Sequence, residues 1–255
     1  MVKSRVVAIV NREIESLMVR QPFHVRADDK QSGEQIPPLE PGDRLTRDEF
    51  ERRYEAMPRG IKAELLEGFV HMPSPTRYRR HGRPHLHLIT WLGYYESGTP
   101  GVEAGDNSTT RLDIDNEPQP DAVLLIDPAC GGQAHISTDD YIEDAPEFVA
   151  EVAASSVSID MHTKFRIYER SGVREYLVWR VLEQAVDWFV LRAGHYERLV
   201  PDTQGVLRSE VFPGLWLDTA ALLRGDIAAV LTTLQQGLMG PEHETFVARL
   251  HPPSA

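Results

Sequence analysis

One carboxylate interrupts a run of apolar residues in the middle of the sequence. The segment FVAEVAA, residues 148–154, has the composition of a buried strand apart from Glu151. An ionised carboxylate in a dry protein core is costly, so Glu151 should be neutral, paired or bound to a cation. Side chains alternate along a strand, which predicts that Glu151 shares its face with Val149 and Ala153. An ordinary alternative is an acid on the half-hydrated face of an edge strand.

Two further patterns supply an acid and a base that could act with Glu151. Asp121 follows a proline and opens the apolar run AVLLI, although aspartate is also common in turns before strands. Asp160, Lys164 and Tyr168 recur every four residues, which places them along one face of a helix. On a surface helix such an ion pair would contribute only about 0.2–0.5 kcal/mol. Each pattern has an ordinary structural explanation when it is taken alone.

Taken together, the three patterns resemble the arrangement of the PD-(D/E)XK nuclease fold, in which a strand that opens with Pro-Asp, a following strand with an internal acid and a nearby lysine hydrolyse a phosphodiester. Two carboxylates on adjacent strands bind the hard cation Mg²⁺ through oxygen at about 2.0–2.1 Å, which leaves its other positions to water and a phosphate oxygen. The metal lowers the pKa of a bound water and stabilises charge that develops on the phosphate. A lysine can hold the attacking water or help to deprotonate it. An ionised Glu151 would then have a metal as its counterion.

Helices and strands must bring these side chains together. Apolar spacing and end signals predict helices over residues 46–58, 78–97 and 159–171, and an interrupted helix over residues 219–239. Thr46 and Glu49 match a capping box at the first of these helices. Extended segments lie between them, and Glu67-Gly68 marks a turn between two strands. The predicted fold class is α/β, with a mixed β-sheet that carries the two acids and is flanked by helices.

Five separated segments resemble, in the same order, the Uma2 family, also called DUF820. This family is grouped with restriction endonucleases in the PD-(D/E)XK nuclease superfamily. The matching segments are AELLEGFVHMPSP, PDAVLLI, FVAEVAASS, IDMHTKFRIYERSGVREYLVW and FPGLWL. The resemblance covers about residues 45–239, and its specificity comes from the order of the segments. It implies a restriction-endonuclease-like fold.

The resemblance also implies roles for single residues. Asp121 and Glu151 would be the metal ligands, and Glu64 would be an additional catalytic acid. The position of the usual strand lysine is Ala153 here, so its role would move to Lys164 on the following helix. The implied cofactor is Mg²⁺, with Mn²⁺ as an alternative, and the implied substrate is DNA. A homodimer is expected because two sites would cut two strands.

The charge of the chain restricts how it could meet DNA. A formal net charge of −12 disfavours broad, sequence-independent attraction to nucleic acid. A local basic surface is therefore needed, and the segment TRYRRHGRPH supplies one. An ordinary alternative is a solvated loop and helix start. The expected substrate-binding residues in this segment are Arg77, Arg80, His81 and Arg83.

Two other functions compete with the nuclease. A nuclease-fold module could bind a partner, and even a metal, without cleaving anything. A zinc hydrolase could use His81, His85 and His87, together with His162 from the later helix. His81 and His85 would share a helical face while His87 points away, which disfavours zinc. Thiolate ligation within one chain is excluded, because the sequence contains a single cysteine.

The chain divides into three parts by composition. Residues 1–44 form an arm or linker with a short helix over residues 5–19, residues 45–240 form the nuclease-like domain, and residues 241–255 form a C-terminal tail. No apolar stretch approaches the roughly 18 residues that a membrane span needs, and the start of the chain lacks the features of a signal peptide. A cytoplasmic protein without membrane contact is expected. Neither the form of the DNA substrate nor its sequence is encoded in a motif.

Overall fold

The computed structural model describes residues 36–250. The short helix expected over residues 5–19, most of the N-terminal arm and the last five residues of the tail lie outside the described residues. The helices are α2 (Arg47–Glu55), α3 (Arg83–Ser97), α4 (Phe165–Ser171), α5 (Thr219–Arg224), α6 (Ile227–Leu238) and α7 (Pro241–Leu250). Short helical turns are η1 (Tyr78–Gly82), η2 (Pro128–Cys130) and η3 (Ile159–Lys164), of which η1 and η3 are π-helical.

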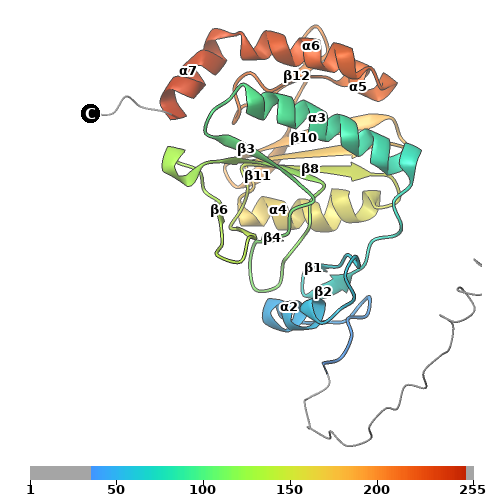
Figure 1. The fold of residues 1–255 in the computed structure, drawn as a ribbon. Helices are drawn as coiled ribbons and strands as arrows, with labels where there is room; N and C mark the ends of the chain where they lie inside the picture. Colours follow the sequence, from blue (N-terminus) through green and yellow to red (C-terminus); the bar gives the residue numbers. More distant parts are fainter. Residues whose placement is uncertain (1–35, 251–255) are drawn as a thin grey trace, which may run out of the picture. The chain divides into compact units, whose positions relative to one another are not determined.

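The strands form one large sheet and three small ones (Figure 1). The large sheet contains β3 (Val102–Asp106), β5 (Ala122–Ile126), β8 (Phe148–Ala153), β9 (Glu175–Arg180), β10 (Ala185–Arg192) and β11 (His195–Arg198). The small sheets contain β1 (Glu64–Leu66) with β2 (Phe69–His71), β4 (Thr110–Arg111) with β6 (His135–Ile136) and β7 (Ile142–Glu143), and β12 (Val206–Arg208) with β13 (Trp216–Asp218). This architecture confirms the expected α/β class with a mixed sheet flanked by helices.

The central strands of the large sheet bring the two acids to one place. The strand order is β11-β10-β9-β8-β5-β3, in which β8 and β9 run parallel and the other neighbours run antiparallel. Ala122 on β5 pairs with Ala150 on β8. One residue further along this register, Asp121 comes opposite Glu151. Glu151 therefore lies on a central strand, and the edge-strand alternative is wrong.

The two faces of β8 belong to different hydrophobic clusters. Phe148, Ala150 and Val152 pack in a large cluster with α3, α5, α6 and α7. Val149 and Ala153 pack in a second cluster on the side of α4. Figure 1 shows α3 and α6 on one side of the sheet and α4 on the other. The alternation expected from the sequence is confirmed, and Glu151 faces α4.

Helix α3 holds the strands from one side through large aromatic side chains. Its fully buried positions Leu88, Trp91, Leu92 and Tyr95 follow the spacing of one helical face. The Trp91 ring meets the ring of Trp188 on β10 edge to face, with 5.7 Å between their centroids. Full burial of such a side chain contributes roughly 1.5–3 kcal/mol or more. The basic segment at the start of α3 is thus attached to a rigid helix.

A smaller N-terminal lobe carries Glu64. Helix α2 and the β1–β2 hairpin share a separate apolar cluster around Phe50 and Leu65. Glu67 and Gly68 adopt positive φ values of 53° and 78°, which confirms the expected turn. An isolated β-bridge between Leu65 and Glu117 joins the hairpin to the rest of the domain. This bridge fixes where Glu64 points.

The helix ends differ from the sequence expectations in two places. Thr46 makes no side-chain capping bond, and the Glu49 carboxylate accepts hydrogen bonds from Arg52 and Arg53, so the expected capping box is wrong. Residues 241–250, expected to be part of a tail, form α7. Its mostly polar sequence hides three buried side chains, His243, Phe246 and Leu250. The expected break near Gly225 is confirmed, since α5 ends there with a φ of 74°.

Candidate active site

Glu151 lies almost completely buried beneath the start of α4. Its Oε1 accepts a hydrogen bond from Nζ of Lys164 at 2.9 Å and another from the hydroxyl of Tyr168 at 3.0 Å. Burial raises the pKa of Glu151 well above its ordinary value, against the lowering effect of Lys164, and nearby carboxylates add to the rise. Lys164 and Tyr168, which were expected to share a helical face, thus both contact Glu151, the one acid of β8.

Lys164 joins two acids that lie far apart in the sequence. Its Nζ is 2.7 Å from Oε1 of Glu64 and 2.9 Å from Oε1 of Glu151, and its side chain is only 5% exposed. The same oxygen of Glu64 accepts a hydrogen bond from the main-chain N–H of Gln119 at 2.7 Å. Burial alone would lower the pKa of Lys164, but the two carboxylates raise it well above its ordinary value. The lysine is therefore a charged donor.

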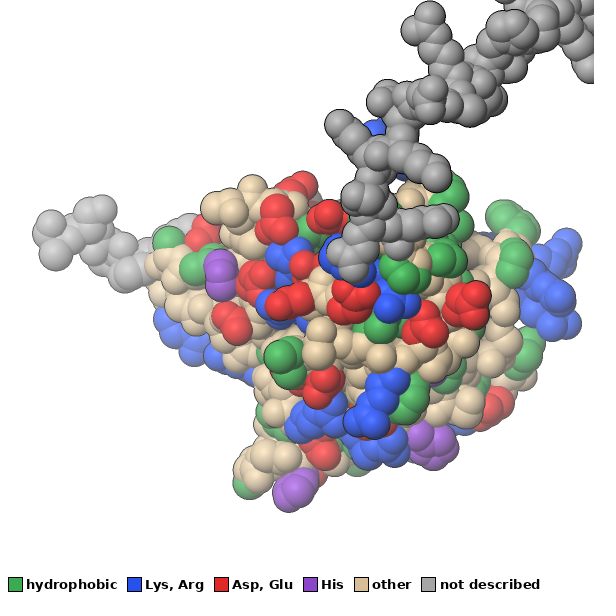
Figure 2. All heavy atoms as spheres, turned by 90° about the horizontal axis from the view of Figure 1, so that it is seen from below, with side chains coloured by type: hydrophobic (Ala, Val, Ile, Leu, Met, Phe, Trp, Pro, Cys, Tyr) green, Lys and Arg blue, Asp and Glu red, His purple; other side chains and the backbone are tan. Residues whose placement is uncertain are grey.

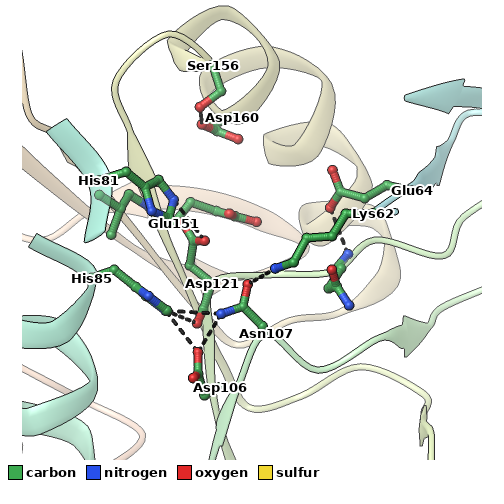
Figure 3. Close-up of polar contacts among 12 residues, drawn as sticks. Lys62, Glu64, His81, His85, Asp106, Asn107, Asp121, Glu151, Ser156 and Asp160 are labelled. Carbon is green, nitrogen blue, oxygen red and sulfur yellow. Dashed lines mark hydrogen bonds and ion pairs between the residues drawn. The ribbon is translucent and has the colours of Figure 1, made fainter. Parts of the chain in front are cut away.

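A third carboxyl, Asp160, adds to the negative charge around Lys164. It is buried on η3, and its Oδ2 accepts a hydrogen bond from the Ser156 hydroxyl at 2.6 Å (Figure 3). Burial raises the pKa of Asp160 to about 6, while Lys164 acts in the opposite direction. Both π-helical turns of the described chain carry residues of this site, and such turns are frequent at functional sites.

Asp121 is held by both of its carboxylate oxygens. Oδ2 accepts a hydrogen bond from the main-chain N–H of Val152 at 2.7 Å, and Oδ1 lies 3.1 Å from Nε2 of His81 (Figure 3). Burial acts to raise the pKa of Asp121, but these two partners bring it below its ordinary value. The hydrogen bond to Asp121 raises the pKa of His81. The histidine expected to bind substrate thus contacts an expected metal ligand directly.

A polar network that the sequence did not predict contacts the main chain of Asp121. Nε2 of His85 lies 2.9 Å from the main-chain oxygen of Asp121 and 2.9 Å from Oδ1 of Asp106. The Asn107 amide donates to the same Asp106 oxygen at 2.6 Å, and its Oδ1 accepts from Nζ of Lys62 at 2.5 Å (Figure 3). The period-2 spacing of Lys62 and Glu64 at the start of a strand could have indicated a shared face.

The expected substrate-binding arginines fall into two groups. Arg77 and Arg80, with Arg79 between them, are exposed on or beside η1, the turn that carries His81. They form no ion pair with any of the described residues 36–250. The guanidinium of Arg83 lies instead beside Gly225 and His87, at the end of α5. Arg77 and Arg80 therefore belong to the same turn as His81, which contacts Asp121, whereas Arg83 points to the end of α5.

One face of the molecule carries both signs of charge. Figure 2 shows Lys and Arg side chains in small groups between Asp and Glu side chains on the face seen from below in Figure 1. This mixture agrees with the formal net charge of −12. Attraction of a polyanion would therefore depend on a local group of cations.

The chemistry of the donor set fits a hard divalent cation. Four buried or nearly buried carboxyl groups surround Lys164, namely Glu64, Asp121, Glu151 and Asp160. This excess of acid leaves negative charge that a cation would neutralise, and carboxylate oxygens are the ligands that Mg²⁺ prefers. Within residues 36–250, no three or more His, Cys, Asp or Glu residues are grouped so as to hold a metal ion. Asp121 and Glu151 are the two residues that would hold such a cation.

The alternative zinc site has no such support. The rings of His81 and His85 lie 5.5 Å apart, but Nε2 of each is directed to an aspartate, and His87 is buried. No group of three ligating residues including histidines occurs in the part of the chain that the structure describes. The expectation that His87 points away from the other two agrees with its burial.

Comparisons with known proteins support the family and the fold. The family model Uma2, described as "Putative restriction endonuclease", matches residues 47–220. A crystal structure of "a putative nuclease belonging to DUF820 from Anabaena variabilis ATCC 29413" aligns with a TM-score of 0.52 and 14% sequence identity, covering 68% of this chain and 97% of that chain. At this identity the similarity concerns the fold. No curated protein matches the chain. None of the helices in residues 36–250 is long and apolar enough to span a membrane.

Proposed function

The chain belongs to the Uma2 family, and from this membership we propose that it is an endonuclease that hydrolyses phosphodiester bonds in DNA. One observation carries the proposal. Two carboxylates from adjacent central strands, Asp121 and Glu151, lie beside a buried lysine that is hydrogen-bonded to one of them. This arrangement has the components that metal-assisted phosphodiester hydrolysis needs.

In this proposal Asp121 and Glu151 would hold Mg²⁺, or Mn²⁺ in its place. Such a cation would supply a water of lowered pKa and neutralise charge on the phosphate. Lys164 stays protonated because two carboxylates raise its pKa, so it orients the attacking water as a donor. Glu64 and Glu151 together hold the Lys164 ammonium in place.

The DNA backbone would approach along the turn that precedes α3. Arg77 and Arg80 are exposed, and no acid among the described residues neutralises them, so their charges remain for phosphates. The raised pKa of His81 favours a third positive charge on the same turn. Arg83, which lies beside Gly225, would contribute at longer range. A homodimer would allow two such sites to cut both strands of a duplex. Light scattering on the purified protein tests this, because the mass in solution distinguishes a monomer from a dimer.

The decisive test compares wild type with Glu151→Gln, which removes the charge and keeps the shape. Calorimetric titration with Mg²⁺ and with Mn²⁺ measures metal binding, and plasmid and oligonucleotide assays on the same preparations measure cleavage. Glu117→Gln is a matched control, because Glu117 is another buried carboxyl that contacts none of the four acids around Lys164. We expect Glu151→Gln to lose metal binding and cleavage while Glu117→Gln keeps both.

The same experiment separates the nuclease from the alternative function. A wild-type protein that binds metal and DNA but cleaves neither duplex, single-stranded nor branched DNA would be a nuclease-fold binding module. Unchanged cleavage in Glu151→Gln would contradict the proposed site. Metal-independent cleavage by wild type would contradict the proposed role of Asp121 and Glu151.

A further inference from the structure

Lys62 is an exposed cation at the edge of the acidic site. Residues 36–250 contain only two lysines, and the other one, Lys164, is buried between Glu64 and Glu151. Lys62 lies just before β1, two residues from Glu64, and its Nζ donates to Oδ1 of Asn107 at 2.5 Å. Figure 3 shows its side chain extending toward Asn107 beside Asp121.

The partner of Lys62 also touches the proposed metal ligand. The main-chain N–H of Asn107 donates to the main-chain oxygen of Asp121 at 3.3 Å. The charge of Lys62 also acts on His81, whose ring lies 3.1 Å from the Asp121 carboxylate. The ammonium group is therefore held within the polar surroundings of Asp121 by a neutral amide, and it forms no ion pair with the described part of the chain.

A phosphodiester that enters this site meets an excess of negative charge. The ammonium of Lys164 is already engaged by two carboxylates and is buried, so it offers little charge to a second anion. Lys62 has the opposite properties, because it is exposed and its one hydrogen-bond partner is uncharged. A lysine ammonium is a compact point charge on a flexible stem, which suits contact with a single phosphate oxygen.

We propose that Lys62 is a phosphate-binding residue that leaves Asn107 and contacts a non-bridging oxygen of the DNA backbone next to Asp121. This inference rests on the proposed nuclease function and adds a substrate contact to it. Asn107 then serves as the resting partner that keeps the ammonium directed toward the site. No bond is made or broken by Lys62 in this role.

Binding of a labelled DNA oligonucleotide, in duplex and single-stranded form, tests the inference without cleavage. Ca²⁺ replaces Mg²⁺, and the dissociation constant is measured over a series of salt concentrations for wild type, Lys62→Gln, Lys62→Arg and Arg59→Gln. Arg59→Gln is the matched control, because it removes one exposed positive charge from the same loop and Arg59 has no ion pair among residues 36–250. Thermal unfolding confirms that each variant is folded.

We expect Lys62→Gln to weaken binding roughly tenfold and to reduce the slope of log K against log salt by about one, as for loss of one phosphate contact. Lys62→Arg should keep most of the affinity, and Arg59→Gln should stay close to wild type. Equal losses in Lys62→Gln and Arg59→Gln would show a general charge effect and overturn the inference. DNA cleavage by wild type together with unaltered binding by Lys62→Gln would overturn the inference alone, whereas the absence of any DNA binding and cleavage by wild type would overturn the proposed function as well.

Discussion

The ammonium of Lys164 lies 2.9 Å from Oε1 of Glu151, although the strand of Glu151 and the helical turn of Lys164 are separated by a loop. Both side chains are almost fully buried, so water does not solvate either charge. The pair explains how an apolar strand can contain an acid. It also links the stability of the domain to the groups that the proposed reaction uses.

Replacing Lys164 by methionine should destabilise the protein strongly. The change leaves Glu151 and Glu64 buried without their cation, and breaking a buried ion pair costs about 3–5 kcal/mol in the free energy of unfolding. Urea denaturation at neutral pH measures this loss. The double variant Lys164→Met, Glu151→Gln should regain about 1 kcal/mol or more of the lost free energy of unfolding, because one uncompensated charge is removed. Additive effects of the two changes would contradict direct coupling.

Replacing His81 by alanine should strengthen metal binding. In the structure Nε2 of His81 lies 3.1 Å from Oδ1 of Asp121, so His81 would compete with a cation for this carboxylate. Loss of one hydrogen bond of about 1 kcal/mol corresponds to a roughly fivefold higher affinity for Mg²⁺ in calorimetric titration. His85→Ala is the control, because Nε2 of His85 lies beside the main-chain oxygen of Asp121 and not its carboxylate. Weaker Mg²⁺ binding by His81→Ala would instead make His81 part of the metal site.

Replacing Glu117 by glutamine should flatten the dependence of stability on pH. Burial and the neighbouring Glu51 raise the pKa of Glu117 from 4.5 to about 8. Between these two values the folded protein keeps a proton that the unfolded chain loses. Wild-type stability therefore falls as pH rises through this window, by at most about 1.4 kcal/mol per pH unit from this group.

Denaturation of wild type and Glu117→Gln at pH 5, 6, 7 and 8 checks this prediction. The glutamine variant should resemble wild type at the lowest pH and be more stable at the highest pH. Arg111 acts to lower the pKa of Glu117 and forms an ion pair with Glu143, so Glu143→Gln is the control for a changed charge around this arginine. Parallel pH profiles for wild type and Glu117→Gln would mean that Glu117 is ionised throughout.

Replacing Tyr168 by phenylalanine should remove one of the two donors to Oε1 of Glu151. The hydroxyl is fully buried and lies 3.0 Å from this oxygen. We expect the free energy of unfolding to fall by about 1 kcal/mol and the cleavage rate to fall with it, because the carboxylate is held less firmly. Tyr94→Phe, at a partly exposed position on α3, should change neither quantity. Full activity of Tyr168→Phe would show that Lys164 alone positions Glu151.

Local patterns in the sequence were sufficient to predict most of the elements around the site and which side chains of one strand or helix lie together. The alternation in FVAEVAA determines which side chains share the face of Glu151, and the four-residue spacing determines that Lys164 and Tyr168 lie together. These features depend on strand and helix periodicity within a few residues, so they can be read from the chain alone. The metal, the DNA substrate and the catalytic roles remain predictions that the experiments above test.

Only the tertiary structure decided which distant residues meet. The β5–β8 register brings Asp121 opposite Glu151, and the β1–β2 hairpin brings Glu64 to Lys164 across about a hundred residues of sequence. The contacts of Lys62 with Asn107 and of His81 with Asp121 likewise join separate elements. No local periodicity encodes such pairings, because they arise from the packing of whole helices and strands around shared cores. For the same reason residues 241–250 were expected to belong to a tail, since the burial of three side chains of α7 depends on the surface against which the helix packs.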